Sequence, residues 1–204
     1  MKILAEDVSK KFRQELVIKQ FNYTFLSGNS YALTGPNGSG KSTLLKLLSQ
    51  FSLPTSGHIH YDHQYVPISS DDAFQYVAFV APYTDLIEEF SPSELIEFLR
   101  KSTFLPNHFN IEAFEEFSEL RTSRSKIIKN FSSGMRQKVK LSLAMASQRP
   151  ILFLDEPTSN LDEKAKAWFE KTLKTQQEKL IILASNEPEE IKQCTHTLSI
   201  LDYK

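Results

Sequence analysis

The chain has 204 residues, a formal net charge of −1 and 40% apolar residues, a composition typical of a globular protein long enough for one well-packed domain. The near-neutral charge argues against a surface built as a whole for nucleic acid, so no nucleic-acid partner is expected. The single cysteine, Cys194, excludes an internal disulfide framework. The longest apolar run, residues 180–184, is far shorter than the roughly 20 residues that a membrane-spanning helix needs.

The first part of the chain shows strand patterns around one helix. Phe21, Tyr23 and Phe25 alternate with polar residues, which is the period-2 pattern of a half-buried strand. The other elements expected here are strands at residues 31–34, 58–61 and 76–81 and a leucine-rich helix at 42–49.

The middle of the chain, residues 83–130, has a mostly helical pattern. Ser91, Pro92 and Glu94 form a capping-box signature with proline in the first turn, which predicts the start of a helix. A second helix with an acidic face is expected at residues 111–120. This block predicts a small helical subdomain inserted into a sheet.

Strands and helices alternate again in the last third. The elements expected in order are a helix at 133–147, a buried strand at 151–154, a helix at 163–176, a buried strand at 180–184, a helix at 187–194 and a last strand at 196–202. This alternation indicates βαβ units and an α/β fold with parallel strands.

A glycine-rich loop follows the strand at 31–34 and opens the helix at 42–49. It fits the phosphate-binding pattern G-x-x-x-x-G-K-[ST] and consists of Gly35, Pro36, Asn37, Gly38, Ser39, Gly40, Lys41, Ser42 and Thr43. The glycines allow successive backbone N–H groups to point inward, and the helix N-terminus favours an anion. Lys41 is predicted to reach the β and γ phosphates, and the Ser42 hydroxyl to bind Mg²⁺. A plain strand-to-helix turn is the alternative.

Two carboxylates end the apolar strand at 151–154. Asp155 and Glu156 therefore stand at the carboxyl end of a strand, where α/β sheets bind ligands. Asp155 is predicted to help hold Mg²⁺, and Glu156 to act as a general base on an attacking water. On its own such a strand end is also compatible with an ordinary loop start.

A third motif, residues 131–137, reads Phe-Ser-Ser-Gly-Met-Arg-Gln and precedes a helix. Ser132 suits a helix N-cap, and serine, glycine and a helix N-terminus together suit an anion.

With these motifs in this order, the chain resembles an ATP-binding cassette (ABC) ATPase subunit. The glycine-rich loop matches Walker A, residues 131–137 match the signature, 151–155 match Walker B with Glu156 next, and 159–162 match the D-loop. The resemblance implies an α/β P-loop NTPase fold of ABC type, with a mixed sheet core and an N-terminal antiparallel β region. It also implies one nucleotide-binding domain over 1–204 with a helical insert at about 83–147. By the same resemblance Phe12 stacks on adenine, although a buried strand phenylalanine is an equal alternative.

The family's mechanism implies two cassettes packed head to tail around two ATP molecules. Ser133 and Gly134 would then contact the γ-phosphate held by the other copy, and Asp162 would touch the partner's site. The cofactors implied are ATP and Mg²⁺. The second cassette is expected to be another copy of this chain, with a different cassette as the alternative.

The signature departs from the family's pattern at Ser133, which replaces a glycine, and at Met135, which replaces a glutamine; two further departures concern catalysis. Pro82 stands where the Q-loop has glutamine, and Asn186 stands where the H-loop has histidine. Proline has no side-chain hydrogen-bonding group, and an asparagine amide cannot take up a proton as histidine does. We therefore expect ATP hydrolysis with a lowered rate, with Asn186 and Glu156 as the catalytic side chains.

The resemblance favours the ATPase subunit of a membrane transporter, bound to the inner face of the cell membrane through a separate multi-span subunit. That subunit is expected to dock near residues 82–89 and the helix after Ser91. The alternatives are a soluble ABC ATPase outside transport and an ATP-sensing cassette with weak hydrolysis. The sequence specifies neither the transported molecule nor the direction of transport.

Overall fold

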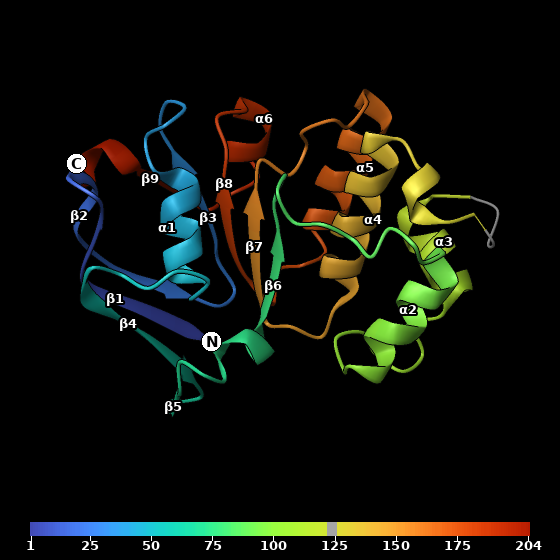
Figure 1. Ribbon diagram of the computed structural model, residues 1–204, viewed down its shortest axis with the longest axis horizontal. Helices are drawn as coiled ribbons and strands as arrows, with labels where there is room; N and C mark the ends of the chain where they lie inside the picture. Colours follow the sequence, from blue (N-terminus) through green and yellow to red (C-terminus); the bar gives the residue numbers. More distant parts are fainter. Residues whose placement is uncertain (122–125) are drawn as a thin grey trace. The chain divides into compact units, whose positions relative to one another are not determined.

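A computed structural model describes residues 1–121 and 126–204 (Figure 1). The chain forms two compact units. The first contains Met1–Phe79, Pro150–Glu156 and Gln176–Lys204, and the second contains Val80–Arg149 and Pro157–Thr175. Residues 122–125 of the helical insert expected at about 83–147 lie outside the described residues.

An antiparallel sheet of the first unit has the strand order β2-β1-β4-β5. Its strands are β1 (Lys2–Phe12), β2 (Glu15–Leu26), β4 (Ser56–His63) and β5 (Val66–Ile68). On β2, Phe21 and Phe25 are fully buried and Tyr23 is partly buried, whereas Asn22 and Thr24 are exposed. The period-2 pattern of the sequence therefore corresponds to a strand with one face on the core.

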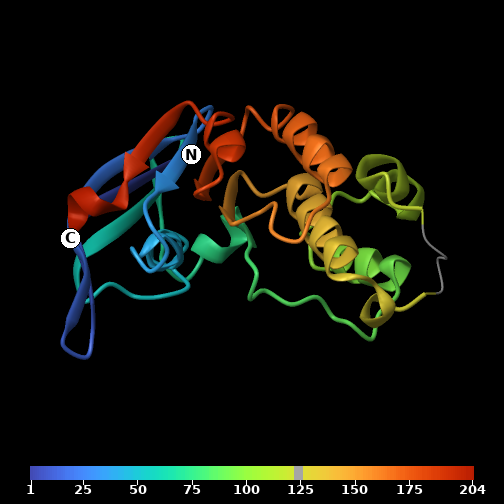
Figure 2. The ribbon, with the colours of Figure 1, turned by 90° about the horizontal axis from the view of Figure 1, so that it is seen from above.

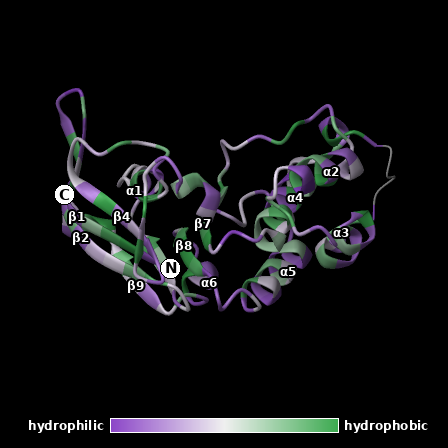
Figure 3. Ribbon diagram, turned by 90° about the horizontal axis from the view of Figure 1, so that it is seen from below, coloured by the Kyte–Doolittle hydropathy of each residue, from purple (hydrophilic) through white to green (hydrophobic). Residues whose placement is uncertain are grey.

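The second sheet has the order β6-β7-β8-β3-β9. Its strands are β3 (Ser30–Thr34), β6 (Val77–Val80), β7 (Ile151–Asp155), β8 (Leu180–Ala184) and β9 (His196–Ser199). Every residue of β7 and β8 is buried, and both strands are hydrophobic except for Asp155 at the end of β7 (Figure 3). β7, β8, β3 and β9 pair in parallel, as expected of strands covered on both faces.

Helix α1 (Lys41–Leu48) lies between the two sheets of the first unit (Figure 2). Four of its leucines have no exposed surface: Leu44, Leu45, Leu47 and Leu48. They join one hydrophobic core with β1, β2, β7 and β8, so this core fixes where α1 begins relative to β3. The unit also contains α6 (Pro188–Ile191) and the 3-10 helices η1 (Ala73–Tyr76) and η3 (Ile200–Tyr203).

The second unit is helical and has its own hydrophobic core. It contains α2 (Pro92–Lys101), α3 (Ile111–Ser118), η2 (Ile128–Asn130), α4 (Ser133–Ala146) and α5 (Glu163–Leu173). The capping box predicted for α2 is present, because the Ser91 hydroxyl accepts from the Glu94 backbone and the Glu94 carboxylate accepts from the Ser91 backbone. Trp168 of α5 donates from Nε1 to the Phe117 carbonyl at 2.8 Å.

The end of the chain differs from expectation. The helix predicted at 187–194 stops at Ile191. The residues that follow form hydrogen bonds between residues i and i+3, such as Cys194 N to Ile191 O, instead of α-helical bonds. The last strand stops at Ser199, whose hydroxyl accepts from Leu201 N and opens η3. None of the helices in residues 1–121 and 126–204 combines the length and apolar character needed to cross a lipid bilayer.

Candidate functional site

The glycine-rich loop joins β3 to the first turn of α1. Gly40 is the helix N-cap with φ of 101°, and the helix begins at Lys41. Lys41 is only 6% exposed, and its ammonium donates to the carbonyl oxygens of Gly35 at 2.7 Å and Pro36 at 3.3 Å. The cation is thus folded back over the concave side of the loop, next to the N-terminal end of a helix dipole.

Two details of the loop test whether it suits phosphate. A Cβ on Gly40 would stand 2.9 Å from Val17 Cγ1 of β2, so this position is restricted to glycine by space as well as by its φ. Ser39 is 5% exposed, and its Oγ has no hydrogen-bond partner among the described residues. A buried hydroxyl without a partner is costly, and a phosphate oxygen bound in the loop is a suitable acceptor.

The acidic strand end lies at the same edge of the sheet as this loop. Asp155, the last residue of β7, is 1% exposed and pairs with Ala184 of β8. Glu156 is exposed, has a φ of 45° and donates from its backbone N to the Ala184 carbonyl at 2.9 Å. A glutamate with a backbone in the left-handed region is strained, and such strain is more frequent at functional sites than elsewhere.

The end of β8 brings a third segment to this edge. Ser185 N donates to the Leu33 carbonyl of β3 at 3.2 Å, and the next residue, Asn186, donates from Nδ2 to Oδ1 of Asn37 at 2.9 Å. The residue at the H-loop position thus contacts the phosphate-binding loop directly. The three strand ends β3, β7 and β8 therefore gather the predicted phosphate, metal and base groups at one edge of one unit.

Phe12 ends β1 in the same unit, and its residue is 50% exposed. The interpretation of Phe12 as a buried strand phenylalanine is therefore wrong. Lys10 Nζ lies 5.1 Å from the centroid of the Phe12 ring. Phe12 pairs with Glu15, so the ring stands at the tip of the β1–β2 hairpin. An exposed ring of this kind can stack on a planar base.

The signature residues belong to the second unit. Ser132 is the N-cap of α4, and its hydroxyl accepts from Met135 N at 3.2 Å. A Cβ on Gly134 would stand 2.7 Å from the Asn160 carbonyl oxygen, so the signature and the D-loop segment touch at a glycine. Gln137, whose role the sequence did not reveal, is 3% exposed and donates to the Pro157 carbonyl at 2.8 Å.

A pocket of about 360 Å³ lies against these signature residues. Its walls include the first turns of α4 and α5, with Ser133 and Gly134 from one and Asp162 from the other. Asp162 caps α5 by accepting from Ala165 N at 2.8 Å. Lys138 lines the pocket, lies 4.8 Å from the Trp168 ring centroid, and has its pKa lowered by burial. The N-termini of α4 and α5 and the Lys138 amine are the positive groups of this pocket, and the carboxylates of Glu119 and Asp162 lie beside them.

The segment after β6 is attached to the signature helix. Lys140 donates from Nζ to the carbonyl oxygens of Ala81 at 3.2 Å and Thr84 at 2.9 Å, and burial lowers its pKa. One turn earlier, Arg136 forms an ion pair of 3.5 Å with Glu88. Pro82 lies between the two carbonyls that Lys140 holds. Neither cation was predicted as a contact from the sequence, although their four-residue spacing places them on one face of α4.

The fold and the glycine-rich loop define an ATP-binding cassette. The model of the ABC transporter family matches residues 18–159. This span is most of the chain, and the chain belongs to the ABC transporter family.

Two curated relatives illustrate the similarity. The Nod factor export ATP-binding protein I of Burkholderia lata is 29% identical over 201 residues, which cover 96% of this chain and 66% of that protein. A probable ABC transporter ATP-binding/permease protein of Haemophilus influenzae is also 29% identical, over 98% of this chain and 38% of that protein. The chain thus spans slightly less than two thirds of the length of the Nod factor export relative.

Solved structures confirm the predicted fold. A putative ABC transporter ATP-binding protein from Pyrococcus furiosus has a TM-score of 0.83 and 24% identity, with all of both chains covered. A dimeric ATP-binding cassette in a post-hydrolysis state, bound to ADP and Pi, has a TM-score of 0.83 and 20% identity over 97% of this chain and 93% of its own. At these identities the likeness is one of fold.

Proposed function

We propose that the chain is a single nucleotide-binding domain that binds and hydrolyses ATP to drive a membrane ABC transporter. The observation that carries the proposal is the gathering of the glycine-rich loop, Asp155 with Glu156, and Asn186 at the carboxyl ends of β3, β7 and β8. Ligands of α/β sheets bind at this edge. The residues proposed to hold ATP within the chain are Phe12, Gly35, Pro36, Asn37, Gly38, Ser39, Gly40, Lys41, Ser42 and Thr43.

Different residues of the loop contact the triphosphate and Mg²⁺ in this proposal. Lys41 exchanges its two carbonyl contacts for phosphate oxygens, and the Ser39 hydroxyl gains an acceptor. Mg²⁺ usually takes one or two protein oxygens besides phosphate oxygens, and Ser42 and Asp155 provide a hydroxyl and a carboxylate of this kind. When bound, Mg²⁺ would neutralise charge on the phosphates.

Glu156 is the proposed general base. Its carboxylate is exposed at the sheet edge and follows the buried Asp155 directly. Pro82 and Asn186 replace two groups that would otherwise help to order the water and stabilise the transferring phosphoryl group. The loss of one such group typically lowers turnover by about 10²-fold or more. We therefore propose slow turnover of the isolated chain.

In this proposal the signature pocket contacts the ATP molecule that the partner cassette holds. Ser133 and Gly134 contact the γ-phosphate that the other cassette holds, and Asp162 reaches the partner's site. Support comes from the position of Ser133, Gly134 and Asp162, which line one pocket together with the N-termini of α4 and α5, and a helix N-terminus favours an anion. A homodimer is the simplest assembly, and a heterodimer with a complete cassette is the alternative.

Transport requires a multi-span membrane subunit, which would hold the chain on the inner face of the cell membrane. The proposed docking region is residues 82–89 with the start of α2, where Tyr83 and Ile87 are 46% and 37% exposed. The similarity to Nod factor export ATP-binding proteins favours export over import. A second candidate is an ATP-sensing cassette with weak hydrolysis, which the replacements at Pro82 and Asn186 favour.

Binding is tested with Lys41→Ala and, as a matched control on the same helix, Lys46→Ala. A fluorescent ATP analogue with Mg²⁺ should lose most of its affinity only for Lys41→Ala, since Lys41 supplies the main counter-charge at the loop. Equal affinity of both variants would contradict the phosphate site.

Dimer formation is tested by light scattering in a Glu156→Gln background that retains ATP. Mg-ATP should double the mass of Glu156→Gln, and adding Ser133→Arg should block the increase while leaving ATP binding intact. If both proteins dimerise equally, the signature does not act across an interface.

A further inference from the structure

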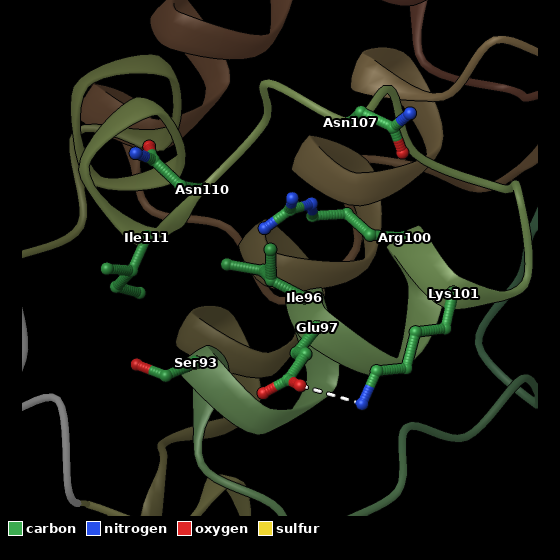
Figure 4. A pocket seen from close by; sticks show the side chains of 8 residues that line it. All are labelled: Ser93, Ile96, Glu97, Arg100, Lys101, Asn107, Asn110 and Ile111. Atoms are coloured by element: carbon green, nitrogen blue, oxygen red, sulfur yellow. Dashed lines mark ion pairs between the residues drawn. The ribbon is translucent and has the colours of Figure 1, made fainter.

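A separate pocket in the helical unit is lined by six polar or charged side chains and two isoleucines (Figure 4). Its volume is about 390 Å³, which is within the range of small-molecule sites. The lining residues come from α2, from α3 and from the connection between them: Ser93, Ile96, Glu97, Arg100, Lys101, Asn107, Asn110 and Ile111. None of them belongs to the phosphate-binding loop, the signature or the D-loop.

The guanidinium of Arg100 has one buried N–H group in this pocket without a hydrogen-bond partner among the described residues. Its Nε is buried and makes no hydrogen bond within residues 1–121 and 126–204. The neighbouring carboxylate of Glu97 is taken by Lys101 in an ion pair of 2.7 Å. In Figure 4 the guanidinium extends over Ile96 toward α3, away from that ion pair. A desolvated guanidinium N–H without an acceptor is costly, so an acceptor from outside the chain would stabilise it.

Other groups around Arg100 are also hydrogen-bond donors. Asn110 uses Oδ1 to cap α3 by accepting from Ala113 N at 2.9 Å, which leaves its Nδ2 group as a donor. Asn107 and Ser93 add an amide and a hydroxyl to the wall. The charges on the wall are two cations and one carboxylate, of which one cation and the carboxylate neutralise each other. The remaining positive charge belongs to Arg100.

One part of the wall is apolar. Ile96 is 3% exposed, and Ile111 is partly buried at the start of α3. The pocket is also much larger than a bare phosphate or carboxylate group. A ligand that fills it therefore needs an anionic head for Arg100 and an apolar body for the isoleucines.

We propose that this pocket binds a small organic anion, with a carboxylate or phosphate head on Arg100 and a short apolar body against Ile96 and Ile111. Carboxylate and phosphate are the groups that the planar guanidinium fork pairs with best.

The site is tested with benzoate and phenyl phosphate as anionic probes and benzyl alcohol as their neutral match. The experiment uses the full chain with Lys41→Ala, so that the phosphate-binding loop does not compete for phenyl phosphate. The Arg100 Nε–H signal in ¹H–¹⁵N NMR spectra should shift saturably with at least one anion and not with benzyl alcohol.

Variants locate the effect. Arg100→Gln should weaken binding of the active anion by about tenfold or more, because a charge-assisted hydrogen bond is lost. Arg100→Lys should retain part of the affinity, and Lys171→Gln, which removes an exposed positive charge from α5, should retain all of it. A shift that does not saturate, an equal response to benzyl alcohol, or equal affinity of Arg100→Gln would overturn the proposal. If Arg100→Gln does not fold, the comparison of charged and neutral probes on the Arg100 Nε–H signal alone decides.

Discussion

The Asn186 side chain donates a hydrogen bond of 2.9 Å to the side chain of Asn37, 149 residues away in the sequence. One partner follows β8 and the other lies in the phosphate-binding loop. An amide at the H-loop position therefore already reaches the loop that is proposed to hold ATP. What it lacks is the ability to hold a proton.

Replacing this amide by imidazole should accelerate hydrolysis. Asn186→His is expected to raise steady-state phosphate release by about tenfold or more, since a positioned proton-transfer group typically contributes 10²- to 10⁴-fold. Asn37→Ala, which removes the observed contact without adding a titratable group, is the control and should not accelerate release. Fast hydrolysis by the unmodified isolated chain would falsify the impaired-site idea.

Phe12 offers a test of adenine recognition on the β1–β2 hairpin. Phe12→Ala should weaken binding of the fluorescent ATP analogue by about tenfold, because base stacking on an aromatic ring contributes about 1–3 kcal/mol. Phe12→Tyr should preserve affinity. Leu16→Ala removes another exposed apolar side chain from the same hairpin and should have no effect. Equal losses for Phe12→Ala and Leu16→Ala would argue for a general effect on the hairpin.

Gly134 tests the contact between the signature and the D-loop segment. An added methyl group would meet the Asn160 carbonyl at 2.7 Å, so Gly134→Ala should displace the residues that line the signature pocket. In the Glu156→Gln background we expect ATP-dependent dimerisation to require at least about tenfold more protein, which corresponds to about 1.4 kcal/mol. ATP binding by the single chain should be unchanged, because the phosphate-binding loop lies in the other unit. Unaltered dimerisation would show that the Asn160 segment adjusts without cost.

Lys140 tests the attachment of the segment after β6. Lys140→Met removes both hydrogen bonds to the carbonyls of Ala81 and Thr84 and retains much of the apolar stem. Amide hydrogen exchange of residues 81–88 should become about tenfold faster, as expected for the loss of roughly 1.4 kcal/mol of local stability. Lys171→Met on α5 is the control. Exchange equal to that of the parent protein would mean that other contacts, such as the Arg136–Glu88 ion pair and the Lys129 N to Glu88 O hydrogen bond, hold the segment without Lys140.

Lys179 predicts a pH-dependent stability. Burial lowers its pKa from 10.5 to about 8 in the folded chain. Below pH 8 Lys179 is protonated in both the folded and the unfolded chain, so the buried charge lowers the free energy of unfolding by up to about 3 kcal/mol. This loss of stability decreases as the pH rises from 8 to 10.5. Lys179→Met should therefore raise Tm at pH 7, and its advantage should shrink by pH 10. A Tm difference that is the same at both pH values would exclude this origin.

The sequence predicted best those elements whose signals are local. The start of α2 followed from Ser91 and Glu94, which satisfy each other's backbone within one turn. Both limits of β8 were predicted, because a run of five apolar residues bounded by polar ones permits few alternatives. The end of the chain was mispredicted because it is determined by distant contacts: Ile200 is completely buried, and the Tyr203 ring lies 4.6 Å from that of Phe21.

The same distinction applies to the candidate site. The motif spacing predicted that the glycine-rich loop and the Asp155–Glu156 pair follow strand ends, and the structure places them after β3 and at the end of β7. It gave no sign that Gln137 donates to the Pro157 carbonyl or that Lys140 bridges two carbonyls. In each case the acceptor is a backbone carbonyl, which every residue type has, and it lies 20 or more positions away in the sequence. Such contacts leave no signature in the residue that accepts them.

The place of β3 in its sheet has a consequence for how the protein is made. Its neighbours are β8 and β9, so that Ser30 pairs with Ile181 and Tyr31 with His196. During synthesis β3 therefore remains unpaired at both edges until about 150 further residues have left the ribosome. Open edges invite pairing with other chains, and contacts this distant in sequence form slowly. The nascent chain is therefore most vulnerable to aggregation while the helical unit is being translated, and a chaperone that covers β3 over that interval would increase the yield of folded protein.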